Sequence, residues 1–394
     1  MTAQPIYQGP MSHTLTGEMI DPFLLWAVER GASDIVFRAD DPPWVQIDGV
    51  WLKAVDFFVS AAECEFLCNY FSGQAHKAGN VQTGRSADFA YSLATDQRGH
   101  KQRFRVNVTA TNAGHYIVMR SLPTRLPLMH DLGLEDDITR NIYPPNGIII
   151  ISGVMGSGKS TLLAGVIHSA ILRKEFGGIG LGRQILTLEQ PIEFNFSDIP
   201  HERRSAPIAQ SEIELHVTTW QDGVRSMTRR KGEIVMVGEA RDRETLESMI
   251  STVEQGVLAY ATVHAQDVPQ TITRIVNTFP EEEQQPIASV LKANLRMIVH
   301  QRLVPRLPRP QDEGKDVPGR IALREYLVFS EDLRMQLYNT PYEQLVPTVR
   351  KMVETRGQPL VKDAWNKYQE KLISDETYMS IRHEQESMKH QSSV

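Results

Sequence analysis

One short segment constrains the fold of this chain more than any other. Residues 153–160 read G-V-M-G-S-G-K-S and match the pattern G-x-x-x-x-G-K-S. Residues 148–151 are apolar and predict a strand before the segment, and residues 161–171 predict a helix after it. In this context the glycines let backbone amides surround phosphate groups, and the helix N-terminus adds a favourable dipole. We therefore predict a P-loop domain whose nucleotide-binding residues are Gly153, Val154, Met155, Gly156, Ser157, Gly158, Lys159, Ser160 and Thr161.

Two residues of this segment indicate which cofactors the domain would take. Lys159 would neutralise charge on the β- and γ-phosphates, and the Ser160 hydroxyl would bind Mg²⁺. The guanine-specific pattern N-K-x-D is missing, since residues 366–369 read N-K-Y-Q. We therefore expect ATP and Mg²⁺ rather than GTP.

Acidic side chains follow two apolar runs further along the chain. Residues 185–188 precede Glu189, and residues 234–237 precede Gly238 and Glu239. The carboxyl ends of parallel strands face the ligand crevice, so we expect both carboxylates beside the γ-phosphate. One would orient or deprotonate the attacking water, and Glu239 would hold Mg²⁺ directly or through water. The sequence leaves open which of the two is the general base.

Two further polar residues lie close to such strand ends. The apolar run 258–263 ends at His264, which we expect either to sense the γ-phosphate as part of the catalytic set or to be structural. Glu193, four residues after Glu189, is expected to be structural.

The pattern of predicted elements changes at residue 122 and divides the chain. A flexible tail, residues 1–18, precedes a small α+β sheet domain, 19–121, and a proline-punctuated linker, 122–129. Short apolar runs then alternate with helical stretches over 130–340, which is typical of a parallel sheet covered on both faces. Residues 341–394 are expected to form C-terminal helices and a tail.

Several features of the first domain support specific predictions. Asp21 is expected to cap a helix that has Pro22 in its first turn. The Asp48-Gly49 pair predicts a hairpin, and strand 103–108 should pair with strand 116–120. Cys64 and Cys68 are spaced as one apolar face of a helix over 61–71, so we expect no metal there.

Composition excludes some classes of protein. The net charge is −6 and basic residues occur only in local clusters, which argues against nucleic acid as a direct ligand. No apolar run reaches the roughly 18 residues of a membrane span, and the first 18 residues show no signal-peptide pattern. We therefore expect a cytoplasmic protein.

The order of these segments resembles a known family. The P-loop, the acidic segment at Glu189, the sequence V-G-E-A-R-D at 237–242 and the segment around His264 occur in the order of the secretion ATPases of type II and type IV systems, which include the pilus retraction motors. Residues 31–34, 42–43, 47–49 and 103–107 resemble the PAS-like N-terminal domain of that family. The resemblance therefore implies an α/β fold with a RecA-like P-loop ATPase domain preceded by a small α+β PAS-like domain. Within the family, residues 229–231, 301–305 and 322–329 resemble the DotB and TraJ type of type IVB secretion and plasmid conjugation.

The chain also departs from parts of this family. Retraction motors carry Glu-Asp-Pro in the acidic segment, whereas residues 189–191 read E-Q-P. The C-terminal motif A-I-R-N-L-I-R-E of retraction motors is missing, and the single cysteine pair differs from the two C-x-x-C pairs of extension and type II motors. The missing C-terminal motif argues against pilus retraction, whereas the kept Glu189 leaves the expectation of hydrolysis unchanged.

The resemblance implies an assembly and a set of arginines. It implies a homohexameric ring in which arginine fingers reach a neighbouring subunit, at Arg105, Arg120 and Arg103, although a solvated strand face is the alternative for all three. Further candidates for phosphate contact or a subunit salt bridge are Arg229, Arg230 and Arg241.

The function implied is ATP hydrolysis that powers a type IV, IVB-like secretion or conjugative transfer apparatus. The expected partners are its inner-membrane and cytoplasmic components, with a second ATPase as a further candidate, and the expected location is peripheral at the inner membrane. Three alternatives stay open: a pilus retraction or assembly motor, a RecA-like nucleic-acid translocase, and a nucleotide-gated assembly module that does not hydrolyse ATP.

Overall fold

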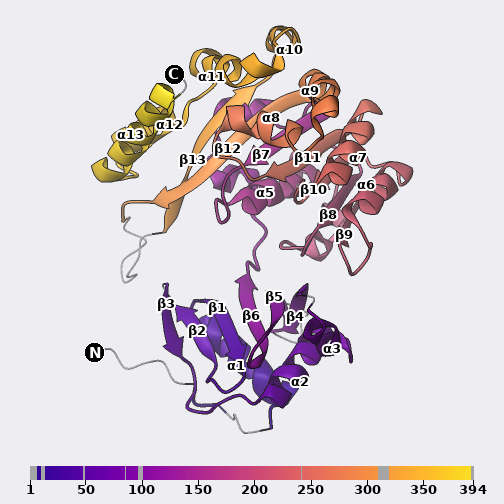
Figure 1. The fold of residues 1–394 in the computed structure, drawn as a ribbon, viewed down its shortest axis with the longest axis vertical. Coiled ribbons are helices and arrows are strands. Elements are labelled where there is room, and N and C mark those ends of the chain that lie inside the picture. The colour runs from indigo at the N-terminus through magenta and orange to yellow at the C-terminus, as the bar shows by residue number, and fades with distance from the viewer. Residues whose placement is uncertain are drawn as a thin grey trace. The chain divides into compact units, whose positions relative to one another are not determined.

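The structure, a computed structural model, describes residues 7–9, 14–47, 49–84, 86–95, 101–240, 242–308 and 319–391. These residues form two compact units. The first contains the residues up to Arg125 together with the segment Gln190–Phe194, and the second contains the rest from Leu126 onward. Each unit has its own sheet (Figure 1). No helix in the described part of the chain is long and apolar enough to cross a membrane.

The first unit is a small α+β domain, as predicted from the sequence. Its six strands form an antiparallel sheet in the order β3-β2-β1-β6-β5-β4. The predicted hairpin and the predicted pairing of strands 103–108 and 116–120 are both present. Its elements are α1 Gly17–Glu29, β1 Ala32–Arg38, β2 Trp44–Ile47, β3 Val50–Lys53, α2 Ala61–Ser72, α3 Lys77–Gln82, β4 Ala87–Ala94, β5 Lys101–Thr111 and β6 Gly114–Leu122.

Helix α2 shows how local sequence and core packing agree in this unit. Ser60 caps the helix, since its hydroxyl accepts from the Glu63 amide while the Glu63 carboxylate accepts from the Ser60 amide. Cys64 and Cys68 face the core and are buried, which confirms the predicted apolar helix face. Burial raises the pKa of the Cys64 thiol to about 12 and that of Cys68 to about 11, so both stay neutral.

Helix α1 begins earlier than the sequence indicated. We predicted Asp21 as its N-cap, but the cap is Thr16 and Pro22 lies inside the helix. The Asp21 carboxylate is used elsewhere, because it accepts hydrogen bonds from the hydroxyls of Tyr70 at 2.9 Å and Tyr91 at 2.8 Å. These long-range partners are not visible in the local sequence, so the capping prediction was wrong.

The second unit is built on a seven-stranded sheet in the order β13-β12-β7-β11-β10-β8-β9. All neighbours are parallel except β12 and β13, which are antiparallel. The four predicted apolar strands are β7, β8, β10 and β11, whereas β9 and β12 were not predicted as strands. The strands are β7 Gly147–Ser152, β8 Ile185–Glu189, β9 Ile208–Glu212, β10 Ile234–Val237, β11 Leu258–Val263, β12 Leu295–Pro305 and β13 Arg320–Val328.

Helices cover this sheet and continue to the C-terminal end of the described residues. Every residue of β7 and β11 is buried, which shows that both faces of the sheet centre are covered. The α-helices are α4 Asp136–Asn141, α5 Lys159–Ile171, α6 Trp220–Arg229, α7 Arg243–Glu254, α8 Val268–Val276, α9 Glu281–Asn294, α10 Glu331–Tyr338, α11 Leu345–Arg356, α12 Leu360–Gln369 and α13 Asp375–Gln391. The short 3-10 turns are Met129–Leu132, Lys174–Phe176, Phe196–Asp198, His201–Arg203 and Tyr342–Gln344.

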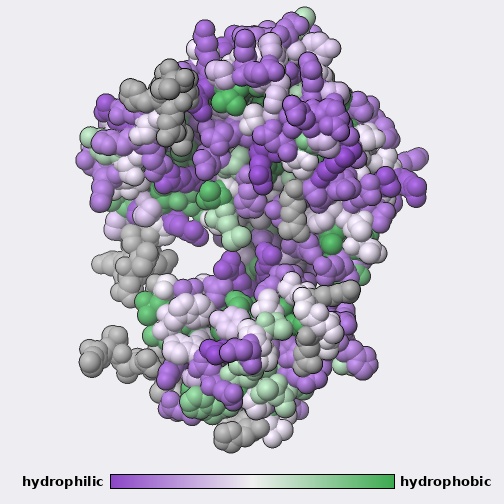
Figure 2. Space-filling model, in the orientation of Figure 1, coloured by the Kyte–Doolittle hydropathy of each residue, from purple (hydrophilic) through white to green (hydrophobic). Residues whose placement is uncertain are grey.

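The visible surface contrasts with these cores. Figure 2 shows one face of the molecule, on which hydrophilic residues predominate and apolar residues occur in small groups. Such scattered apolar groups are ordinary for a folded protein.

Candidate nucleotide-binding site

The P-loop connects the end of β7 to the start of α5, as the sequence predicted. Its backbone needs glycine at three positions, because Gly153, Gly156 and Gly158 have φ angles of 147°, 73° and 83°. At Gly153 space is also lacking, since a Cβ atom there would lie 2.3 Å from the carbonyl oxygen of Gln301. Strand β12 therefore lies directly behind the loop.

Lys159 is the charged group of this loop. Its ammonium donates to the carbonyls of Gly153 at 2.8 Å and Val154 at 2.9 Å, and the residue is only 8% exposed. Ser160 and Thr161, in the first turn of α5, are exposed. A buried cation held over its own loop, beside exposed hydroxyls at a helix N-terminus, fits a phosphate ligand.

Glu189 ends β8 and is almost fully buried. Its carboxylate accepts from the Thr187 hydroxyl at 2.7 Å and from the Gln210 amide at 3.0 Å. Strands β8 and β10 pair in register, and the Gly238 amide donates to the Leu188 carbonyl at 2.7 Å. The two acidic residues therefore follow adjacent strand ends, as the sequence predicted.

Glu239 and His264 lie together beyond the ends of β10 and β11. His264 Nε2 is 3.5 Å from Glu239 Oε1. Burial, and then the charge of Lys159, lower the pKa of His264, although Glu239 opposes this shift. The imidazole is therefore neutral at pH 7. The structure thus brings Lys159, Glu239 and His264 to one edge of the sheet, next to the P-loop.

The three candidate arginine fingers all belong to the first unit. Arg105 and Arg120 are direct partners across β5 and β6. The Arg120 guanidinium donates to Asp34 at 2.9 Å, and Arg105 lies 3.7 Å from Asp88. The Arg103 guanidinium donates to the Glu193 carbonyl at 3.1 Å, within the same unit. Their role toward a neighbouring subunit stays a prediction.

The other basic candidates lie near α6. Arg229 is exposed and lines a polar surface groove between α6 and α7, and Arg230 follows it as the C-cap. Arg241 lies outside the residues that the structure describes. Its neighbour Asp242 caps α7 by accepting from the Thr245 amide at 2.9 Å.

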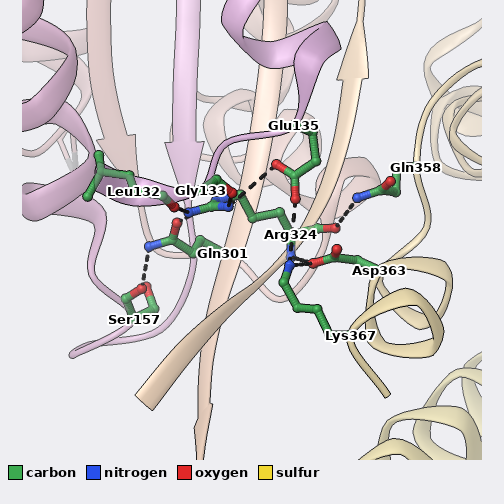
Figure 3. Close-up of polar contacts among 9 residues, drawn as sticks. All are labelled: Leu132, Gly133, Glu135, Ser157, Gln301, Arg324, Gln358, Asp363 and Lys367. Atoms are coloured by element: carbon green, nitrogen blue, oxygen red, sulfur yellow. Dashed lines mark hydrogen bonds and ion pairs between the residues drawn. The ribbon is translucent and has the colours of Figure 1, made fainter. Parts of the chain in front are cut away.

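Two residues that touch or support the loop were not predicted. The Gln301 side-chain amide donates to the Ser157 carbonyl at 2.7 Å, and Arg324 donates to Gln301 at 2.9 Å (Figure 3). Both lie in segments noted above only for their family likeness. No local signal marks either residue, because both strands contain further polar residues, such as His300 in β12 and Glu325 in β13.

Fold and site together define a class: a P-loop nucleotide-binding protein with a RecA-like sheet, preceded by a small antiparallel sheet domain. The comparison with known families is more specific. Residues 91–372 match the model of the type II/IV secretion system protein family, and the chain belongs to this family. This confirms the resemblance stated from the sequence.

Individual relatives agree with this assignment. The type IV pilus retraction ATPase PilT of Pseudomonas aeruginosa is 27% identical over 338 residues, which cover 86% of this chain and 89% of the relative. The X-ray structure of the Legionella pneumophila ATPase DotB superposes with a TM-score of 0.84 and 32% identity, covering 97% of this chain and 99% of DotB. The pilus retraction motor PilT with bound ADP gives a TM-score of 0.74 and 27% identity, covering 92% and 96%.

Proposed function

We propose that this chain is an ATP hydrolase that powers a type IV, IVB-like secretion or conjugative transfer apparatus. The observation that carries the proposal is the grouping of Lys159, Glu239 and His264 beside the P-loop. The ATPase DotB, matched along nearly its whole length, and the ADP-bound structure of PilT support it.

Each residue of the site has a separate role in the proposed hydrolysis. Water attacks the γ-phosphorus, the bond from that phosphorus to the bridging oxygen breaks, and a carboxylate takes the proton from water. We assign this base to Glu239, whose side chain is 32% exposed and lies beside a neutral imidazole. Glu189 is held by two hydrogen bonds and is suited to orienting the water through a fixed carboxylate. Lys159 stabilises the negative charge on the phosphates.

Magnesium fits this site only as a partner of the nucleotide. Among the described residues no group of three histidine, cysteine or acidic side chains could hold a metal by itself. Mg²⁺ is commonly bound through few protein ligands together with substrate phosphates. Ser160 directly and Glu239 through a water are the protein groups we propose for it, which keeps the Glu239 carboxylate available to take the proton.

The proposal also covers how the chain assembles and where it acts. We infer a homohexamer in which Arg105, Arg120 and Arg103 serve the site of a neighbouring subunit, with Arg229, Arg230 and Arg241 as further basic contacts. The proposed partners are inner-membrane and cytoplasmic components of the apparatus, including a second ATPase, which would place the chain at the cytoplasmic side of that membrane. The net charge of −6 gives no support to nucleic acid as a direct ligand.

A second candidate is a pilus retraction or assembly motor. The similarity to PilT over most of both chains favours it. The missing retraction motif argues against it, and residues 189–191 read E-Q-P where retraction motors carry Glu-Asp-Pro.

The test compares ATP turnover and light scattering of the wild type and Glu239→Gln, without DNA. We expect a six-fold assembly in both proteins, and a kcat that is about 10²- to 10⁴-fold lower in the variant because the base is lost. Glu254→Gln, an exposed acid on α7, is the matched control and should turn over like the wild type. A silent monomer that hydrolyses ATP only with DNA would instead establish the translocase. Unchanged turnover in Glu239→Gln would remove Glu239 as the base.

A further inference from the structure

The P-loop is supported from behind by a buried side chain of β12. Gln301, which is 3% exposed, donates from Nε2 to the carbonyl of Ser157 at 2.7 Å across 144 positions of sequence. Strand β12 is close enough that a Cβ atom on Gly158 would lie 2.9 Å from the same Nε2. The side chain therefore holds the last part of the loop, immediately before α5.

This hydrogen bond bears on which backbone amides the loop presents. In a trans peptide the carbonyl and the following N–H point in opposite directions. Holding the Ser157 carbonyl toward β12 therefore directs the Gly158 N–H away from β12. Backbone N–H groups of such a loop are the donors that surround phosphate.

Arg324 on β13 determines the orientation of the Gln301 side-chain amide, that is, which positions its oxygen and its NH₂ group take. Its Nε donates to Gln301 Oε1 at 2.9 Å (Figure 3). A guanidinium has donors but no acceptor, so only the oxygen of the amide, and not its NH₂ group, can pair with it. The NH₂ end of Gln301 is thereby left facing the Ser157 carbonyl.

Arg324 is itself held by other parts of the unit. Its terminal nitrogens donate to the carbonyls of Leu132 at 2.8 Å and Gly133 at 2.9 Å, and Glu135 lies 3.5 Å away. Its backbone amide donates to Asp363 of α12 at 2.8 Å. With Lys367, which pairs with Glu135 and Asp363, the cluster contains two cations and two carboxylates, so the buried charges are balanced.

We propose that Gln301 and Arg324 are positioning residues for nucleotide binding: Arg324 orients the Gln301 amide, and Gln301 holds the Ser157 carbonyl so that the P-loop keeps its phosphate-binding conformation. This inference rests on the proposed ATPase function, because it concerns the same site. It assigns a role in ligand affinity to residues that lie behind the loop.

The decisive variant is Gln301→Glu. The glutamate keeps an oxygen toward Arg324 and adds a charge opposite to it, but it offers no donor to Ser157. We expect the Kd for N-methylanthraniloyl-ADP, measured by fluorescence titration, to rise about five- to tenfold, the effect of losing one hydrogen bond. The KM for ATP should rise in parallel, with kcat within about twofold of the wild type. The unfolding temperature should fall, because the variant adds a third carboxylate to a buried cluster with two cations, so the titration is run well below that temperature.

Arg302→Met is the matched control. Arg302 lies next to Gln301 on β12 and forms an exposed ion pair with Glu384 of α13. Its change to methionine removes that pair and makes the net charge more negative by one, as Gln301→Glu does. Its Kd should equal that of the wild type. Arg324→Lys keeps the charge but cannot serve all the acceptors, so it should raise the Kd at least as much as Gln301→Glu.

The outcomes separate the two proposals. A wild type that neither binds the ADP analogue nor hydrolyses ATP refutes the proposed function. A wild type that binds, together with a Gln301→Glu variant of equal affinity, refutes the positioning role and leaves the function intact. If Gln301→Glu does not fold, Gln301→Met, which also lacks the donor, decides the question by the same Kd comparison.

Discussion

The buried position of Arg324 predicts a stability difference between two arginines on neighbouring strands. The Arg324 side chain is 3% exposed and donates to Gln301 and to two backbone carbonyls. Arg302, on β12, is 38% exposed and pairs with Glu384, which is 44% exposed. The same change to methionine at each position therefore compares a buried charge network with a solvated ion pair.

The expected magnitudes follow from this difference in burial. Arg324→Met leaves buried acceptors unpaired and two carboxylates with one lysine, which should lower the free energy of unfolding by about 3 to 5 kcal/mol. Arg302→Met should lower it by less than about 1 kcal/mol, because solvent screens the exposed pair. For a unit of this size the first change corresponds to a fall in Tm of roughly 6 to 20 °C.

Thermal unfolding followed by circular dichroism measures both variants beside the wild type. The two proteins differ from it only in one long side chain, so lost helix or strand propensity affects both in a similar way. Equal shifts in Tm for the two variants would refute the argument that the Arg324 cluster stabilises this unit through buried, balanced charge.

Two further predictions concern β12 and the loop. Burial lowers the pKa of His300 to about 4, so between pH 6.5 and 4 the unfolded chain binds a proton that the folded chain does not. Urea titrations should therefore show the wild type losing up to about 3 kcal/mol more than His300→Gln across that range, and parallel curves would contradict this. Gly153→Ala should abolish ADP-analogue binding in a fluorescence titration, because its φ is 147° and its Cβ would meet the Gln301 carbonyl. Gly156→Ala has open space around it but a φ of 73°, so it should weaken binding through backbone strain alone and therefore by less than Gly153→Ala.

The central strands and the site residues at their ends were predictable because their signals are local. Strands β7, β8, β10 and β11 are continuous apolar runs, and each leads into the P-loop, Glu189, Glu239 or His264. A parallel sheet places such ends together whatever the details of packing.

Strand β12 and the support behind the loop were not predictable in the same way. Its centre contains His300 and Gln301, which are polar yet buried, and only distant partners satisfy them. The start of α1 was mispredicted for a similar reason, because the Asp21 carboxylate has tyrosine partners 49 and 70 positions away. A local sequence pattern cannot show whether a polar side chain will find a partner across the fold.

The contacts of Lys159 bear on how phosphate binds and leaves in the proposed ATPase cycle. Its ammonium is largely removed from water and donates to the carbonyls of Gly153 and Val154. An arriving phosphate exchanges with these oxygens, so little hydration has to be stripped from the cation. When phosphate leaves, the ammonium is not left without acceptors, because it can again donate to the two carbonyls. The two loop carbonyls and a bound phosphate are therefore alternative partners of one ammonium, so part of what the phosphate gains from Lys159 is offset by the loop contacts it replaces.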